Sequence, residues 1–302
     1  MEHADIISGA YIYTKEAFFG LKQLPRWIVL FLYFAIPILG GLLVATVVLQ
    51  FLVKPVLVGL LVSDNYGFTE VSIGGLLQYF AIILGLACVF FVPLIPGYCY
   101  RIFKSEGPGL PDYHNLWALF FNGWRINAVV LYYAIPVIVI SILYSLVFMY
   151  LFPEAGMYAT LDMLELDSIM FVLTTFSYVA LEFITIIFVS LFAFVGLVHL
   201  ARSGSLSEAM HLRGIAGIIR KIGWYDYILS LVIMSILFLL VTFIIITLAQ
   251  IFAYNGVAIV VLLAVYFFLM IPILVFFIKY LSQVYDTAFL VPESDDTDFD
   301  EF

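Results

Sequence analysis

Charged side chains are scarce in this sequence, and their scarcity excludes an ordinary soluble fold. Only 11% of the 302 residues are charged, 65% are hydrophobic, and the mean hydropathy is +1.17. Soluble domains are about 25% charged and about 45–50% apolar. A soluble chain of this length could not hide so much apolar surface, so we expect the protein to reside in a lipid bilayer.

Residues that usually carry chemistry are equally few. Cys88 and Cys99 are the two cysteines, and their spacing places them about 16 Å apart on one helix, too far for a disulfide. The four histidines have no metal-binding spacing, and no nucleophile elbow, phosphate-binding loop or nucleic-acid signature is present. We therefore predict no catalytic residue, no metal, no cofactor and no nucleic-acid partner.

Long uncharged runs are abundant, and they locate the membrane spans. Four runs of 27, 30, 28 and 34 residues occur, the last interrupted only by Glu182, and a fifth run has 52. One crossing needs about 20 apolar residues, so the fifth run is long enough for two, with an Asn-Gly turn at 253–257. We predict an all-α integral membrane bundle of six transmembrane helices within residues 27–290. The spans are expected at 27–53, 73–103, 125–152, 168–201, 227–253 and 257–281.

The two ends of the chain differ from this membrane domain. Residues 1–26 lack the apolar core of a cleaved signal peptide and are predicted to contain a cytoplasmic amphipathic helix. Residues 291–302 are strongly acidic, which is typical of a disordered tail. Such a tail is either a solvated end or a docking peptide for a basic partner.

Basic residues predict the orientation. Eleven of the 12 lysines and arginines fall on one side of the predicted spans, and only Lys54 falls on the other. Because cytoplasmic loops are enriched in basic residues, we expect both termini to lie in the cytoplasm. The loops on the opposite side, at 54–74 and 153–167, are short.

One short motif occurs twice and suggests internal repetition. Residues 32–39 read LYFAIPIL, residues 131–138 read LYYAIPVI, and a tryptophan precedes each odd-numbered span, at Trp27, Trp124 and Trp224. This pattern favours three parallel repeats about an axis normal to the membrane, although short matches between apolar helices also arise by chance. Each repeat would be an inner helix followed by two spans. The inner helices, expected at 6–24, 112–125 and 206–222, either lie in the headgroup layer or brace the bundle.

One acid and five prolines lie within the predicted spans. Inserting an acid such as Glu182 at mid-membrane depth costs about 2.5–3.5 kcal/mol, so we expect it to be protonated or paired. It is either a proton, cation or substrate site, or a neutral carboxyl hydrogen-bonded to a Tyr, Ser or Thr. The prolines either shape packing or help to build a mid-membrane site. They are Pro37, Pro93, Pro96, Pro136 and Pro272.

The inner loop after span 2 has a recognisable order of residues. A span ends in Gly-Tyr-x-x-Arg, Leu-Pro and an acid follow, and Leu/Phe and Gly precede the next span. The matching residues are Gly97, Tyr98, Arg101, Leu110, Pro111, Asp112, Leu119, Phe120 and Gly123. This order, together with residues 200–215, resembles the archaeal membrane family called domain of unknown function 4013. Tyr113 and His114 depart from it, since a Trp and a second acid are expected there.

The resemblance implies an archaeal plasma membrane protein, but it implies no mechanism, because the family has no established activity. The small loops, the acidic tail and the missing catalytic motifs favour a non-enzymatic scaffold or an accessory subunit of a membrane complex. Its partner would bind through the tail or the inner helices. The alternative is a small-solute or proton-coupled ion transporter that uses Glu182 and the kinked spans. A lipid-modifying enzyme would have to rely on His114, His199 or His211.

Overall fold

Every regular element in the part of the chain that the computed structural model describes is helical, which confirms the predicted all-α class. The described residues are 3–19, 23–61, 70–105, 107, 109–151, 167–251 and 256–290. Five of their helices are long and apolar enough to cross a membrane, or six if the bent pair α4–α5 counts as one. The elements are α1 (His3–Phe18), α2 (Leu24–Val48), a π-helical turn (Leu49–Val53), α3 (Lys54–Leu61), α4 (Glu70–Phe91), α5 (Leu94–Lys104), α6 (Leu116–Leu151), α7 (Asp167–Ser203), α8 (Leu206–Ala209), α9 (Leu212–Ile222), α10 (Trp224–Ile251) and α11 (Gly256–Leu290).

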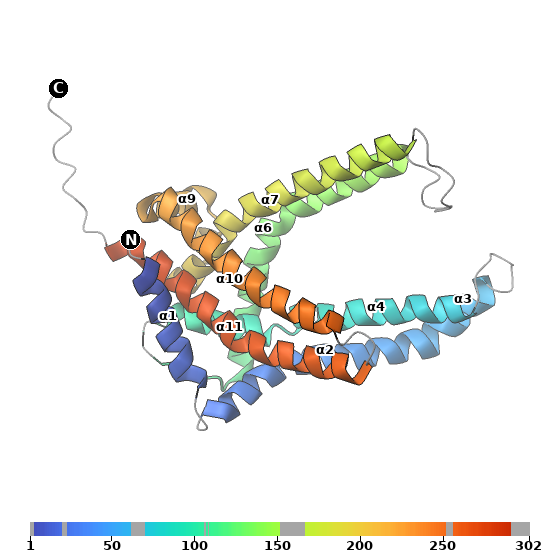
Figure 1. Ribbon diagram of the computed structural model, residues 1–302, viewed down its shortest axis with the longest axis horizontal. Helices are drawn as coiled ribbons and strands as arrows, with labels where there is room; N and C mark the ends of the chain where they lie inside the picture. The colour runs from blue at the N-terminus through green and yellow to red at the C-terminus, as the bar shows by residue number, and fades with distance from the viewer. Residues whose placement is uncertain are drawn as a thin grey trace.

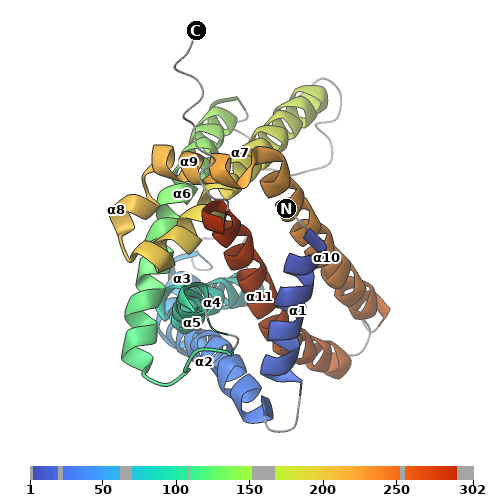
Figure 2. The same ribbon diagram turned by 90° about the vertical axis from the view of Figure 1, so that its left-hand side faces the viewer.

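Three helical hairpins make up most of the molecule (Figure 1). They pair α2 with α4, α6 with α7, and α10 with α11. The hairpins meet at one end and diverge toward the other. Figure 2 looks at the end where they meet, with α1, α8 and α9 in front and the hairpins receding behind them.

The hydrophobic core lies where the hairpins meet, and we call this region the hub. It consists of α1, α5, α8 and α9 and the adjoining ends of the longer helices. Its largest fully buried side chains include Tyr227, Tyr280, Phe18, Leu30, Ile102, Leu119, Leu200, Ile215 and Ile219. In the most apolar stretch of Trp224–Leu248, by contrast, none of the residues is buried. The distal parts of the hairpins therefore expose apolar side chains, which suits a lipid solvent.

A tryptophan at the start of each hairpin packs on a phenylalanine of another hairpin. The pairs are Trp27–Phe268, Trp124–Phe90 and Trp224–Phe192, with ring centroids 4.4, 5.7 and 6.4 Å apart. Trp27 also donates a hydrogen bond from Nε1 to the Phe268 carbonyl oxygen at 2.7 Å. Aromatic pairs contribute about 0.5–1.5 kcal/mol beyond the area that they bury. Because each pair joins a different two hairpins, the three contacts form a closed cycle.

Two glycines allow the backbones of α5 and α6 to touch where these helices cross. A Cβ added to Gly97 would lie 1.8 Å from the Leu119 carbonyl oxygen, and one added to Gly123 would lie 1.9 Å from the Pro93 carbonyl oxygen. Both obstacles are backbone atoms, which cannot rotate away as a side chain can. Small residues allow this close approach of membrane helices. Only glycine therefore fits at either position.

The span expected at 73–103 is divided into two helices. Helix α4 ends at Phe91, α5 begins at Leu94, and the segments Ile83–Phe91 and Leu94–Lys104 are bent by 41° relative to each other. Pro93 precedes α5, with φ −81° and ψ 59°. A proline has no backbone N–H and disfavours the helical conformation in the residue before it, and at Pro93 the backbone leaves the helical conformation, so α4 ends there.

Other helix ends also differ from those expected. An uncharged run indicates which residues can lie in the membrane, but the helix that contains the run can extend beyond it. Helix α3 begins at Lys54, so part of the loop expected at 54–74 is helical. Helix α6 is continuous from Leu116, so no separate inner helix forms at 112–125. Helix α11 continues to Leu290, beyond the end expected at 281. The Asn-Gly turn, most of the two short loops and the acidic tail lie outside the described residues.

Helix α1 packs along α11 in the hub. The apolar periodicity of 6–24 predicts a buried face that includes Ala10, Tyr11, Ala17 and Phe18. Ala10, Ala17 and Phe18 are buried, but Tyr11 is 56% exposed and Tyr13 is buried instead. Tyr13 faces α11, where Lys279 Nζ lies 4.7 Å from its ring centroid.

The glycine crossing generates a stability prediction. Gly97→Ala and Gly123→Ala should each destabilise the protein by about 1–3 kcal/mol or more, because overpacking forces the backbone to shift. Gly217→Ala in α9 is the matched control, because its Cβ would meet nothing within 4 Å. That change should stabilise the protein by about 0.4–1 kcal/mol. Unfolding midpoints in mild detergent test this, and equal midpoints for all three variants would contradict the crossing.

Candidate functional site

Glu182 of α7 belongs to a polar cluster between α6 and α7, distal to the hub. Its Oε1 accepts a hydrogen bond from Ser141 Oγ at 2.8 Å, and Ser141 Oγ accepts one from Tyr178 Oη at 3.4 Å. The ring of Tyr178 stacks on Tyr144 with centroids 3.9 Å apart. Glu182 Oε2 is buried and has no hydrogen-bond partner within the described ranges. The acid thus links the two helices through one of its two oxygens.

This arrangement is compatible with both chemical roles that the sequence suggests for Glu182. A neutral carboxyl needs only a partner such as Ser141 to stay in an apolar environment. A proton or cation site would use the remaining oxygen, Oε2. Within the described part of the chain, no lysine or arginine forms an ion pair with this residue.

The structure distributes the prolines rather than gathering them around the acid. Pro37, Pro136 and Pro272 lie inside α2, α6 and α11, one in each hairpin, and each helix continues through its proline. Pro93 precedes α5, and Pro96 lies in its first turn. Only Pro136 lies on the helix that bonds to Glu182. The five prolines therefore lie in different hairpins.

A groove of about 290 Å³ lies between α6 and α7 on the hub side of Glu182. On α7 it begins at Thr185, three residues after Glu182. Its lining residues are Tyr132, Tyr133, Ile135, Pro136, Thr185, Phe188, Val189, Phe192 and Leu212.

Arg101 holds the inner loop that leads into α6. Its Nη1 donates hydrogen bonds to the carbonyl oxygens of Asp112 and, at 2.8 Å, His114, and its Nη2 donates to that of Asn115 at 3.3 Å. Asn115 has φ 67°, which is unusual for a residue other than glycine. Its Oδ1 accepts a hydrogen bond from the Ala118 backbone N–H at 3.2 Å, so the side chain caps α6.

The remaining residues of the inner-loop motif pack around the same loop. Tyr98 Oη donates to the Pro111 carbonyl oxygen at 3.3 Å, and Leu110 packs against the hub. Gly97 and Gly123 are the two crossing positions of α5 and α6. The motif that carries the family resemblance is therefore brought together, and its members act through packing and backbone hydrogen bonds.

A second polar cluster joins α7 to α11 at the hub. Arg202 Nη2 lies 2.8 Å from Asp286 Oδ2 and donates to Ser282 Oγ at 3.1 Å. His199 Nδ1 lies 2.7 Å from Tyr285 Oη, and its Nε2 lies 3.6 Å from Glu208. No spacing in the sequence relates α7 to α11, so sequence reasoning could not find this cluster. His114 and His211 are exposed.

The position of Lys279 could not be predicted from the sequence either. Lys279 is only 9% exposed and lies within the hub. Its Nζ donates to the Ser105 carbonyl oxygen at 3.3 Å and lies 4.7 Å from the Tyr13 ring centroid. Burial raises the pKa of Tyr13 to about 12, and the positive charge of Arg26 acts in the opposite direction. The Tyr13 ring is thus a neutral face for the lysine cation.

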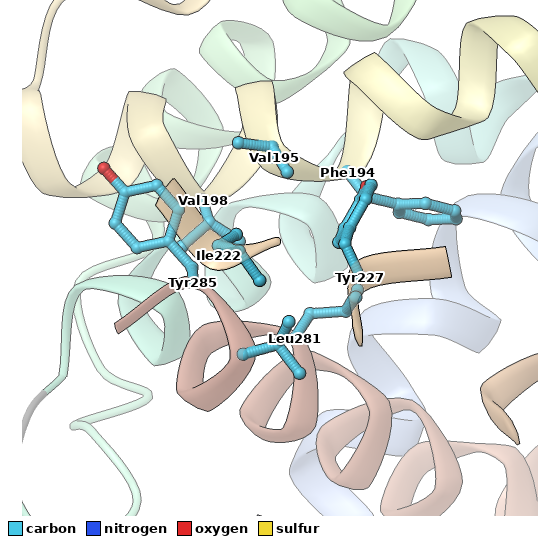
Figure 3. Close-up of a pocket in the computed structure, with 8 residues that line it drawn as sticks. Phe194, Val195, Val198, Ile222, Tyr227, Leu281 and Tyr285 are labelled. Carbon is cyan, nitrogen blue, oxygen red and sulfur yellow. The ribbon is translucent and has the colours of Figure 1, made fainter. Parts of the chain in front are cut away.

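The hub also contains a small apolar cavity of about 10 Å³ between α7, α9, α10 and α11 (Figure 3). A water molecule needs about 10–15 Å³, so this cavity has no room for a larger ligand. In Figure 3 the Tyr285 hydroxyl is directed away from the other labelled side chains. Tyr227 Oη donates to the Leu191 carbonyl oxygen at 2.6 Å. The cavity is therefore a packing defect rather than a binding site.

Within the described ranges, no group of three or more His, Cys, Asp or Glu side chains is placed so that it could hold a metal ion.

Residues 80–250, which are 171 of the 302 residues, match the family model described as "Protein of unknown function (DUF4013)". Among curated proteins and solved structures, none matches the chain significantly.

The hydrogen bonds of Arg101 generate the prediction for this site. Arg101→Gln should destabilise the protein by about 1.5–3 kcal/mol, because a hydrogen bond to a charged group contributes about that much. The loop at 109–115 should then be cleaved faster in limited proteolysis. Lys104→Gln, an exposed change three residues along α5, is the control and should leave both measurements unchanged. Identical cleavage of the two variants would show that Arg101 does not hold the loop.

Proposed function

Because the chain belongs to the DUF4013 family, whose function is unknown, we propose its role from the geometry: a non-enzymatic membrane scaffold or accessory subunit of a membrane complex. The supporting observation is the unequal distribution of packing. The hub is well buried, whereas the distal faces of the hairpins are not. Phe243 of α10, for example, is 71% exposed. Such faces can pack against the spans of another membrane protein without disturbing the hub.

We place the hub on the cytoplasmic side of a plasma membrane. The hub carries α9, whose Arg213, Arg220 and Lys221 are exposed. Basic segments next to spans face the cytoplasm. Helix α1 and the end of α11 lie at the same end of the molecule, which supports two cytoplasmic termini. The partner would bind the distal faces, the inner helices or the acidic tail.

We also propose that the three hairpins are parallel repeats, and the cycle of Trp–Phe contacts supports this. Three residues after Trp124, Asn127 donates to the Phe90 carbonyl oxygen at 2.7 Å. Three residues after Trp224, Tyr227 donates to a carbonyl oxygen next to Phe192. Two odd-numbered spans thus bond to the preceding hairpin with the same sequence spacing.

The repeated Tyr-x-Ala-Ile-Pro motif adds a second parallel. Tyr33, in the first copy, donates from Oη to the Tyr113 carbonyl oxygen at 3.0 Å. Tyr133, at the next position of the second copy, donates to the Ala209 carbonyl oxygen at 2.9 Å. Each acceptor lies in the inner segment that precedes the following hairpin. Each copy of the motif therefore ties its hairpin to the next inner segment, through the first position in one copy and the second position in the other.

The scaffold proposal predicts where a partner will be found. A photo-crosslinking amino acid at Phe243 should capture a stoichiometric membrane protein in cells that express the chain at native level. Tyr225 is the matched control, since it is 77% exposed and lies eighteen residues earlier on α10. Eighteen residues are about five helical turns, so Tyr225 is on the same face of α10 as Phe243 but beside the hub. It should capture little of that protein. Lipid adducts alone at Phe243 would count against a scaffold that uses its distal faces.

A transporter is the second candidate, because Glu182 has one unbonded buried oxygen close to the α6–α7 groove. In that case proteoliposomes should show pH-dependent solute or ion flux. Glu182→Gln should lower the flux about tenfold or more, equivalent to about 1.4 kcal/mol in the barrier. Glu208→Gln at the hub is the control. The scaffold proposal predicts no flux above that of empty vesicles, and equal flux in wild type and Glu182→Gln would exclude this role for Glu182.

A further inference from the structure

We infer that the α6–α7 groove binds one hydrocarbon chain of an anionic phospholipid from the cytoplasmic leaflet, with the lipid phosphate at the basic face of α9. The inference goes beyond the proposed scaffold role, and either can fail without the other. It does require that the hub lie at the cytoplasmic surface.

The size and shape of the groove suit a single chain. Its volume of about 290 Å³ is just below the 300–1,000 Å³ range typical of ligand pockets. Along α7 it extends from Thr185 to Phe192, which corresponds to about 10 Å of helix axis. Helices α6 and α7 run toward the hub, so the groove is parallel to the expected direction of lipid chains.

A hydrogen bond lies beside each end of the groove. At the distal end, Ser141 of α6 bonds to Glu182 of α7. At the hub end, Tyr133 reaches the Ala209 carbonyl oxygen of α8. Gly196 of α7 makes this reach possible, because a Cβ there would lie 2.9 Å from the Tyr133 ring. The groove is thus defined by specific contacts.

The lining requires an apolar occupant. Thr185 Oγ1 already donates to the Leu181 carbonyl oxygen at 2.8 Å, and the Tyr133 hydroxyl is bonded to α8. Most of the other lining residues are aromatic or aliphatic. Phe188 and Ile135 are 62% and 52% exposed, so the groove opens to the surroundings of the hairpin. In a bilayer those surroundings are lipid chains.

Charge identifies the kind of lipid. Leu212 lines the hub end of the groove and is the first residue of α9. Arg213 and Arg220 are exposed and, being seven residues apart, share one face of α9 beside Leu212. Arginine forms charge-assisted hydrogen bonds with phosphate. Glu208, the nearby acid, lies 3.6 Å from His199. A lipid phosphate above the groove would therefore meet a cationic surface.

The test measures lipid retained by the full-length protein. The protein is stripped of lipid in detergent, incubated with phosphatidylglycerol or phosphatidylcholine, and weighed by native mass spectrometry. We expect one phosphatidylglycerol per chain. Val189→Phe, which fills the groove, should lower its retention about tenfold, or about 1.4 kcal/mol in binding free energy. Val179→Phe is the control, since Val179 is 55% exposed on α7 outside the groove.

A second pair of variants tests the head-group contact without altering the groove. Arg213→Gln should remove the preference for phosphatidylglycerol, whereas Lys221→Gln, on another face of α9, should retain it. Equal retention by Val189→Phe and Val179→Phe, or no lipid on the wild-type protein, would overturn the inference. Binding of inorganic phosphate without any retained lipid, equal binding of both lipids, or a stoichiometric protein in place of lipid would also overturn it.

Discussion

The backbone contact between α5 and α6 at Gly97 and Gly123 is the constraint on which the rest of the structure depends. Helix α5 continues the first hairpin and α6 begins the second, so their crossing fixes the relation between these hairpins. The break between α4 and α5 contributes to the same contact, because Gly123 packs against the carbonyl oxygen of Pro93, the residue that precedes α5. The third hairpin is then attached through its aromatic contacts and through the bonds of Arg202 to α11.

Two kinds of packing hold the molecule together, and they follow from the two solvents that it meets. In lipid, apolar helices gain little by hiding apolar surface, so close approach and interhelical hydrogen bonds decide which helices pair. Gly41 of α2 lies directly against Cys88 of α4, and Ser141 bonds to Glu182 across the second hairpin. In the hub, burial of aromatic and aliphatic side chains supplies the main stabilisation. Hairpins that diverge from a buried hub are the expected consequence.

Features that depend on the bilayer could be predicted from the sequence, whereas features that depend on contacts between distant segments could not. The long uncharged runs predict an all-α chain with several apolar helices, since the thickness of the bilayer sets the length of such a run. Glu182 stood out for its charge, and a serine was among its expected partners. The burial of Lys279 and the bond from Arg202 to Asp286 could not be predicted, because both need α11 placed against distant segments. Gly97 and Gly123 were recognised as motif residues, but their role requires the backbones of both helices.

The central claim is that a cytoplasmic hub carries three hairpins across the membrane, and thiol labelling in intact cells tests it most directly. Cysteines introduced at Asn65, Ala155 and Ser207 are treated with a membrane-impermeant maleimide, with the wild-type protein as the background. The account predicts labelling at positions 65 and 155, and labelling at Ser207, an exposed residue of α8, only after the cells are opened. Labelling at 207 in intact cells, with 65 and 155 protected, would contradict it.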